Sequence, residues 1–171
     1  SGFYSEDTIN IGGFSVPDYT FAEVNNTAGL GAMYQQGKFD GICGMGWDAI
    51  SVDGVPTPLQ ALAGSAQLPH NVFAFYLAHG GDGELVVGDV DPAHYTGDFS
   101  YVPVEKSVAS GDGLGYWAVK MDGVEVNGKS VNSASMGIVD SGTSLIACPY
   151  ADMVRIAAAL GAQQSQYGYT A

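Results

Sequence analysis

The stretch GIVDSGTSLIA, residues 137–147, decides the fold, because it places one acid between an apolar pair and a run of hydroxyls. Ile138 and Val139 are typical of a buried strand, which would end at Asp140. Gly142 permits a tight turn with close backbone approach, and hydroxyls at 141, 143 and 144 can donate hydrogen bonds to the carboxylate. The pattern predicts a fixed carboxylate in a half-buried cleft, with the chain returning to the core at 145–146.

An alternative for this stretch is a plain turn, in which the carboxylate of Asp140 does no more than cap the backbone. The short pattern Asp-Ser-Gly is common, so it does not decide between the two interpretations. A serine nucleophile at Ser141 or Ser144 is disfavoured, because the stretch lacks the Gly-x-Ser-x-Gly spacing of a nucleophile elbow.

The composition is that of an acidic globular protein. The 171 residues include 18 acidic and 5 basic residues, for a formal net charge of −13. Such a surface repels phosphate backbones, so no nucleic acid partner is expected, and it suits an acidic compartment. No apolar run approaches the ~20 residues of a membrane span. The chain opens inside a strand pattern, which we interpret as a sign of a fragment or a processed chain.

Most of the chain is expected to form short strands with turn residues between them. Alternating or apolar runs predict strands within 2–13, 14–26, 83–90 and 99–105. Asp122-Gly123 is a strong two-residue hairpin signal, and Asn127-Gly128 repeats it a few residues later. The class is therefore mostly β.

Two helices interrupt the strands. Residues 57–68 begin with Thr57 as a cap and Pro58 in the first turn. Residues 149–162 begin at Pro149, carry a spaced apolar stripe and end at Gly161. Small, polar and glycine-rich residues at 107–115 are typical of a linker and predict a boundary between two parts of the chain.

Other candidate sites are weaker. Cys43 and Cys148 allow one disulfide or none, and two buried free thiols are favoured. The histidines at 70, 79 and 94 are scattered and do not predict a zinc site, so no metal is expected. Asn25-Asn26-Thr27 makes Asn25 a glycosylation candidate.

The stretch from Asp140 to Ser144 resembles the Asp-Thr/Ser-Gly-Thr/Ser signature of pepsin-like aspartic proteases. The resemblance continues, in the family's order, through four further segments: SGFYSEDTINIGG at 1–13, FDGICGMGWDAIS at 39–51, GELVVGDVDPAHYTGDFSYVPV at 83–104 and GYWAVKMDGVEVNG at 115–128. The chain departs from the family pattern at two points. Ser141 stands where Thr is common, and the cysteine that many animal members carry just upstream of this Asp is absent.

The resemblance implies a bilobal, mostly β fold with a cleft between the lobes. Residues 1–106 would be the later part of the N-terminal lobe with the inter-lobe sheet. Residues 107–171 would be the first part of the C-terminal lobe, carrying Asp140 as the second catalytic Asp. The chain contains no other Asp-Ser-Gly or Asp-Thr-Gly, so the first Asp and the flap are expected in a segment upstream of Ser1.

The implied activity is that of an aspartic endopeptidase working at acidic pH. As established for aspartic proteases, two close carboxylates share one proton. The ionised one activates a water, and the protonated one polarises the scissile carbonyl. A lone Asp140 is expected to titrate near the ordinary ~3.9, and this chain alone is expected to be inactive.

The resemblance also implies substrate contacts, partners and a location. Hydrogen bonds to a peptide substrate would come from Gly142, Thr143 and Ser144. The cleft would be lined on one side by Met33, Phe39 and Ile42 and on the other by Tyr116 and Ile138. Pepstatin-like inhibitors would bind in the same cleft. The reaction would need no cofactor or metal. The protein would be secreted or lysosomal/vacuolar. The alternative is a catalytically inactive homologue that acts as a binding or inhibitor protein.

Overall fold

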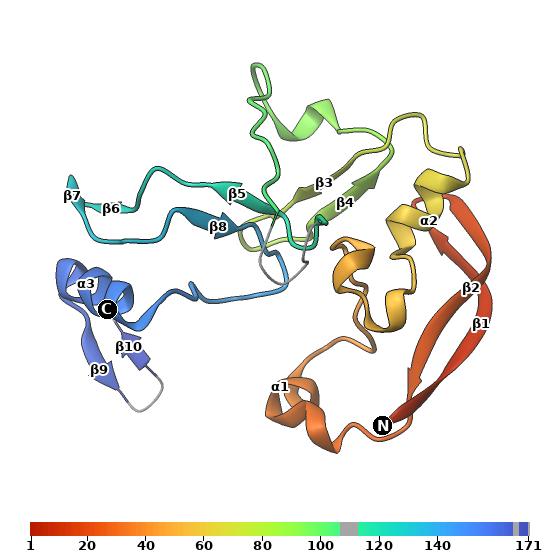
Figure 1. The fold of residues 1–171 in the computed structure, drawn as a ribbon, viewed down its shortest axis with the longest axis horizontal. Helices are drawn as coiled ribbons and strands as arrows, with labels where there is room; N and C mark the ends of the chain where they lie inside the picture. Colours follow the sequence, from red (N-terminus) through yellow and green to blue (C-terminus); the bar gives the residue numbers. More distant parts are fainter. Residues whose placement is uncertain (107–112, 166–167, 171) are drawn as a thin grey trace. The chain divides into compact units, whose positions relative to one another are not determined.

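The computed structural model describes residues 1–106, 113–165 and 168–170, and of these it leaves the side chains at 32, 33, 164, 165 and 168–170 undescribed. The chain divides into two compact units, residues 1–99 and 100–171 (Figure 1). The predicted linker at 107–115 falls mostly outside the described residues. The assignment of the two units to the lobes of a bilobal fold stays a prediction.

The first unit is built on a long hairpin. Strand β1 (Gly2–Ile11) pairs antiparallel with β2 (Phe14–Val24), and the register runs from Gly2 opposite Val24 to Ile11 opposite Phe14. The two-residue loop between them is Gly12-Gly13, with φ of +59° and +86°. Both residues lie in the left-handed region that this kind of hairpin loop requires, and glycine adopts it without steric cost. The predicted strands and their turn are confirmed.

Helix α2 (Pro58–Gly64) covers one face of β2. Leu62 is its fully buried residue. The helix begins where the sequence predicts, since the backbone N–H of Thr57 donates to Gln60 Oε1 over 3.3 Å and Pro58 occupies the first turn. It ends at Gly64, which is earlier than predicted.

A second hairpin lies at the end of the first unit. Strand β3 (Phe73–Tyr76) pairs antiparallel with β4 (Glu84–Val87), so that Tyr76 stands opposite Glu84. The remaining elements of this unit are the short helix α1 (Gly31–Gln36) and single 3-10 turns at Ala28–Leu30, Asp48–Ile50, Val52–Gly54 and Pro92–His94.

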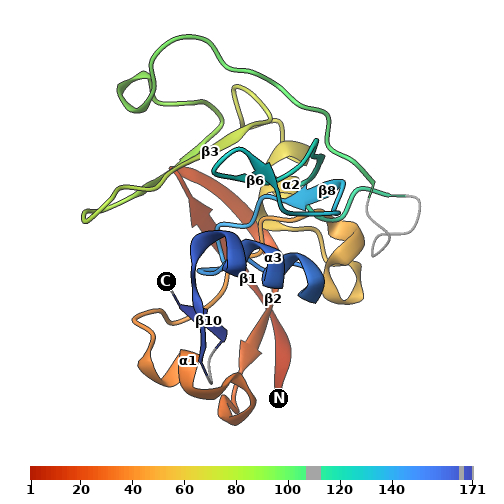
Figure 2. The same cartoon turned by 90° about the vertical axis from the view of Figure 1, so that its left-hand side faces the viewer.

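In the part of the second unit that the structure describes, there are three pairs of short strands and one helix. Its elements are β5 (Ala118–Lys120), β6 (Glu125–Val126), β7 (Lys129–Ser130), β8 (Met136–Ile138), α3 (Tyr150–Leu160), β9 (Gln163–Ser165) and β10 (Gly168–Thr170). Strand β5 pairs with β8, β6 with β7 and β9 with β10, all antiparallel. Helix α3 contacts β6 (Figure 2). As predicted, α3 starts after Pro149 and ends at Gly161, whose φ of +70° is left-handed.

Two local predictions in this unit are wrong. Asp122-Gly123 does not join a hairpin; the chain turns at Asn127-Gly128, with φ of +51° and +73°, and β5 pairs instead with the distant β8. The stretch 99–105 forms no strand beyond a single bridge from Val104 to Val119. In the first case the long-range pairing of β5 with β8 decides the outcome, and a local signal does not report it.

The mostly β class holds for the described residues, in which strands outnumber helices. Among those residues, every helix is too short or too polar to cross a membrane.

Candidate active site

The end of strand β8 positions Asp140. The ladder between β5 and β8 pairs Ala118 with Ile138, and the N–H of Val139 donates to the Trp117 carbonyl over 3.0 Å. The ladder therefore holds the residue directly before Asp140. Extending the same register places Tyr116 opposite Asp140, and Ile138 lies two residues before Asp140 on the same side of the strand. Asp140, Tyr116 and Ile138 therefore share one end and one face of this strand pair.

The turn after Asp140 bonds both of its carboxylate oxygens. The backbone N–H of Gly142 donates to Oδ1 over 2.8 Å, and the hydroxyl of Thr143 donates to Oδ2 over 2.5 Å. A Cβ at position 142 would lie 3.2 Å from Oδ1, so glycine suits this close approach. Ser144 follows in the same exposed turn. The predicted hydrogen-bonded carboxylate is therefore present.

These hydrogen bonds lower the pKa of Asp140. The Thr143 hydroxyl has the largest effect and the Gly142 N–H the next, against a small opposing effect of desolvation. The expectation that a lone Asp140 titrates near its ordinary value is thus wrong. Its turn favours the ionised form even without a second carboxylate.

The expected half-burial of this turn is also wrong. Asp140 is exposed, and the apolar residues around it are 68% (Val139), 79% (Leu145) and 87% (Ile146) exposed. The described residues do not cover these side chains, so the segment does not return to the core at 145–146. Exposed apolar side chains therefore lie on both sides of Asp140 in the sequence.

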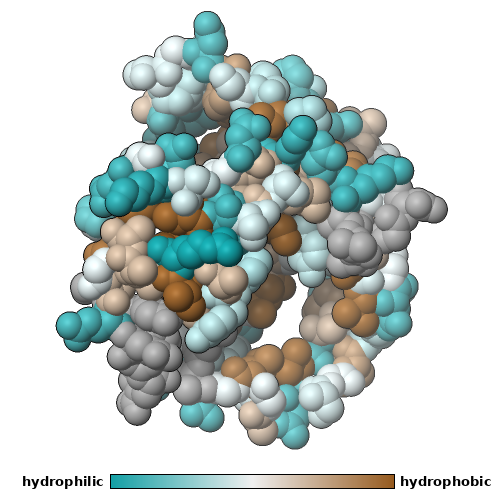
Figure 3. Space-filling view, turned by 60° about the vertical axis from the view of Figure 1, so that its left-hand side comes forward, coloured by the Kyte–Doolittle hydropathy of each residue, from teal (hydrophilic) through white to brown (hydrophobic). Residues whose placement is uncertain are grey.

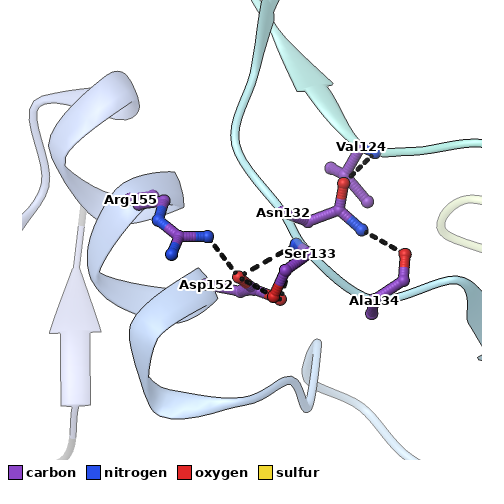
Figure 4. A network of polar contacts seen from close by, with 6 residues as sticks. All are labelled: Val124, Asn132, Ser133, Ala134, Asp152 and Arg155. Carbon is purple, nitrogen blue, oxygen red and sulfur yellow. Dashed lines mark hydrogen bonds and ion pairs between the residues drawn. The ribbon is translucent and has the colours of Figure 1, made fainter.

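A second acid in this unit, Asp152, went unnoticed in the sequence. It is fully buried in the first turn of α3 and accepts hydrogen bonds from the backbone N–H and the hydroxyl of Ser133, all between 3.1 and 3.3 Å. Arg155 Nη1 lies 2.7 Å from its Oδ1. Next to it, Asn132 accepts from the Val124 N–H (Figure 4). The network ties α3 to the loop between β7 and β8, the strand that leads to Asp140. The signal available in the sequence was the spacing of Asp152 three residues before Arg155, the single Arg of the chain.

The predicted cleft residues of the first unit have different surroundings. Ile42 is 85% exposed and lines an open apolar cavity of about 600 Å³ with Tyr4, Tyr19 and Val52 among its walls. Phe39 packs edge-on against Tyr34 at a centroid distance of 5.6 Å and does not line that cavity. The side chain of Met33 lies outside the described residues. The grouping of these three stays a prediction.

The two cysteines are free and exposed, which corrects the expectation that they are buried. The Cys43 sulfur lies 4.0 Å from the Met45 sulfur, and partial desolvation there raises the pKa of the thiol.

Asn25 is exposed at the end of β2 and accepts a hydrogen bond from the Ser1 hydroxyl. Its glycosylation stays a prediction.

Comparison with known proteins gives a consistent result. A family model described as eukaryotic aspartyl protease matches residues 1–171. The chain is 38% identical to "Cathepsin D" of Clupea harengus over 168 residues, which is 95% of this chain and 40% of that protein. It is 38% identical to "Aspartic proteinase" of Oryza sativa subsp. japonica, over 95% of this chain and 32% of that protein. It is also 38% identical to "Vacuolar protease A" of Aspergillus fumigatus, over 87% of this chain and 36% of that protein. The chain thus spans about a third to two fifths of the length of these relatives.

Proposed function

The chain belongs to the eukaryotic aspartyl protease family, and we propose that it supplies the second of the two catalytic carboxylates of an acid endopeptidase. The observation that carries this proposal is the turn at Asp140. Its carboxylate is exposed and receives one local hydrogen bond on each oxygen.

In the proposed mechanism Asp140 is the ionised member of the pair. The Thr143 hydroxyl and the Gly142 N–H stabilise its negative charge, which is why its pKa is lowered. An ionised carboxylate accepts a proton from water and so makes the water a nucleophile. The second carboxylate would carry the shared proton and polarise the scissile carbonyl. This division of roles needs only a carboxylate close enough to Asp140 to share a proton with it.

The other Asp and the flap are proposed to come from a segment upstream of Ser1. Two observations support this partner. The relatives are much longer than this chain, and both units expose large apolar side chains, among them Ile42, Leu145 and Ile146. Figure 3 shows hydrophobic residues reaching the surface between hydrophilic ones. A further apolar segment would remove such surface from water, at a gain of roughly 25 cal/mol per Å² buried.

The substrate is proposed to be a polypeptide. Gly142, Thr143 and Ser144 would hydrogen-bond its backbone next to Asp140, with Tyr116 and Ile138 beside them on the β5–β8 pair. On the first unit Met33, Phe39 and Ile42 would contact a side chain of the substrate. A pepstatin-like inhibitor would occupy the same positions.

The location is proposed to be acidic, in a secreted or lysosomal/vacuolar protein. One relative is named a vacuolar protease. The 18 acidic residues of this chain lose much of their mutual repulsion when protonated, and a sugar on Asn25 would be consistent with passage through the secretory route.

Reconstitution tests the proposal. The chain alone is expected not to cleave an acid-denatured protein, whereas the chain joined to an upstream segment with the first Asp and the flap is expected to cleave it. Pepstatin should bind only the joined form. Cleavage by the chain alone would contradict the need for a partner. A joined form that binds pepstatin without cleaving would favour the binding or inhibitor homologue.

A further inference from the structure

Three side chains of types that can bind a metal ion converge in the first unit, whereas the Asp140 turn belongs to the second unit. One ligand atom from each of Glu84, Asp91 and His94 lies within 4.8 Å of the other two. His94 Nε2 is 2.7 Å from Glu84 Oε2 and 3.8 Å from Asp91 Oδ2. All three side chains are partly exposed, at 28% for His94, 48% for Glu84 and 37% for Asp91, so an ion can reach them from solvent.

The scaffold orients each of these groups. Glu84 begins β4 directly opposite Tyr76 of β3. The Tyr76 ring stacks on the His94 ring at a centroid distance of 3.8 Å and an angle of 9°, which fixes the plane of the imidazole. Asp91 accepts a hydrogen bond from the Ala93 N–H on Oδ1 over 2.8 Å, and this leaves Oδ2 facing His94.

The charge of the first unit favours a cation at this convergence. Residues 1–99 contain twelve acidic residues and Lys38 as their single Lys or Arg. Two carboxylates approach the same ring nitrogen, but Nε2 of a neutral imidazole can make a hydrogen bond with only one of them. A divalent cation at the centre would satisfy all three groups together.

We propose that Glu84, Asp91 and His94 form a Zn²⁺ site. Imidazole nitrogen and carboxylate oxygen are both zinc ligands, with bond lengths of about 2.0–2.2 Å. Donors around a tetrahedral ion then lie about 3.3–3.6 Å apart. The 2.7 Å contact of His94 with Glu84 needs to open, and the 3.8 Å contact with Asp91 needs to close, each by under about 1 Å. Water would complete the shell. Ca²⁺ and Mg²⁺ are disfavoured, because they prefer oxygen ligands alone.

Titration calorimetry at neutral pH tests the site, with zinc chloride added to the full chain. One Zn²⁺ per chain is expected, with Co²⁺ giving the visible absorption bands of a low-symmetry site. His94→Ala, Glu84→Gln and Asp91→Asn should each weaken zinc binding by about tenfold or more, because each removes one of three protein ligands. His79→Ala and Glu6→Gln, which change a histidine and a glutamate outside the cluster, should leave the affinity unchanged.

A circular dichroism spectrum of each variant checks that it is folded. If His94→Ala does not fold, Glu84→Gln still tests the site, because it keeps the shape of the side chain. Zinc binding equal in wild type and Glu84→Gln would overturn the proposal. Binding of Ca²⁺ as tight as that of Zn²⁺ would overturn the assignment of the metal. Both outcomes are independent of proteolytic activity.

Discussion

Asp140 and Asp152 are two carboxylates of the same unit, only twelve residues apart, in opposite environments. Asp152 is buried and bonded by groups from a distant loop and by Arg155, so its ion pair and hydrogen bonds hold the fold together. Asp140 is exposed and bonded only by its own turn, in the contacts that the structure describes. Burial with distant partners makes an acid structural, whereas exposure with local partners leaves it available for chemistry.

The largest expected effect separates the two acids by activity. In the joined protein, Asp140→Asn should lower the cleavage rate by about a thousandfold or more, because the amide cannot accept the proton of the water. The rate of cleavage of an acid-denatured protein measures it. Asp140→Asn should lower the urea midpoint much less than Asp152→Ala does, and full activity in this variant would break the comparison.

The next effect separates them by stability. Asp152→Ala should lower the free energy of unfolding by about 3 kcal/mol, because the Ser133 N–H and hydroxyl lose their partner inside the protein. Urea denaturation measures it. If Asp140→Ala destabilised the chain as much as Asp152→Ala, the distinction between a structural and an available acid would fail.

A smaller effect concerns the pKa of Asp140. Thr143→Val removes the hydroxyl that lowers this pKa most, so the pKa should rise toward its ordinary value, whereas Thr143→Ser should keep it low. The pKa of Asp140 is lower in the folded chain than in the unfolded chain. The ionised carboxylate therefore stabilises the fold above the ordinary pKa, and this contribution is lost as the pH falls through the folded-state pKa. Carboxyl ¹³C NMR follows the titration, and equal curves for the Val and Ser variants would exclude this role of Thr143.

The smallest effect is at Arg155. Its side chain is half exposed although its partner Asp152 is buried, so water screens its charge and Arg155→Gln should cost only about 0.5–1 kcal/mol. The urea midpoint should lie between those of the wild type and Asp152→Ala. A loss as large as that of Asp152→Ala would mean that the ion pair, and not Ser133, holds the network.

Local signals account for what the sequence could predict. Gly12-Gly13, Pro58, Pro149 and Gly161 act through backbone geometry and each marks an element boundary in the structure. The hydrogen bonds around Asp140 were predictable for the same reason, because both donors lie within three residues of it.

Long-range contacts account for what the sequence could not predict. The contact of Asp152 with Ser133 spans nineteen residues, and that of His94 with Glu84 spans ten. The exposure of Leu145 and Ile146 depends on which segments pack over them, and hydrophobicity alone predicted burial. Nothing in the local pattern distinguished Asp122-Gly123 from Asn127-Gly128, because the choice follows from pairing of β5 with β8.

The most direct test of the central claim is the titration of the Asp140 carboxyl carbon, first in this chain alone and then in the chain joined to the upstream segment. A catalytic pair predicts one simple step with a lowered pKa in the chain alone. In the joined protein it predicts two coupled steps, which return to one when the partner Asp is changed to Asn. Identical curves in the two forms would contradict the claim that Asp140 shares a proton with a second carboxylate.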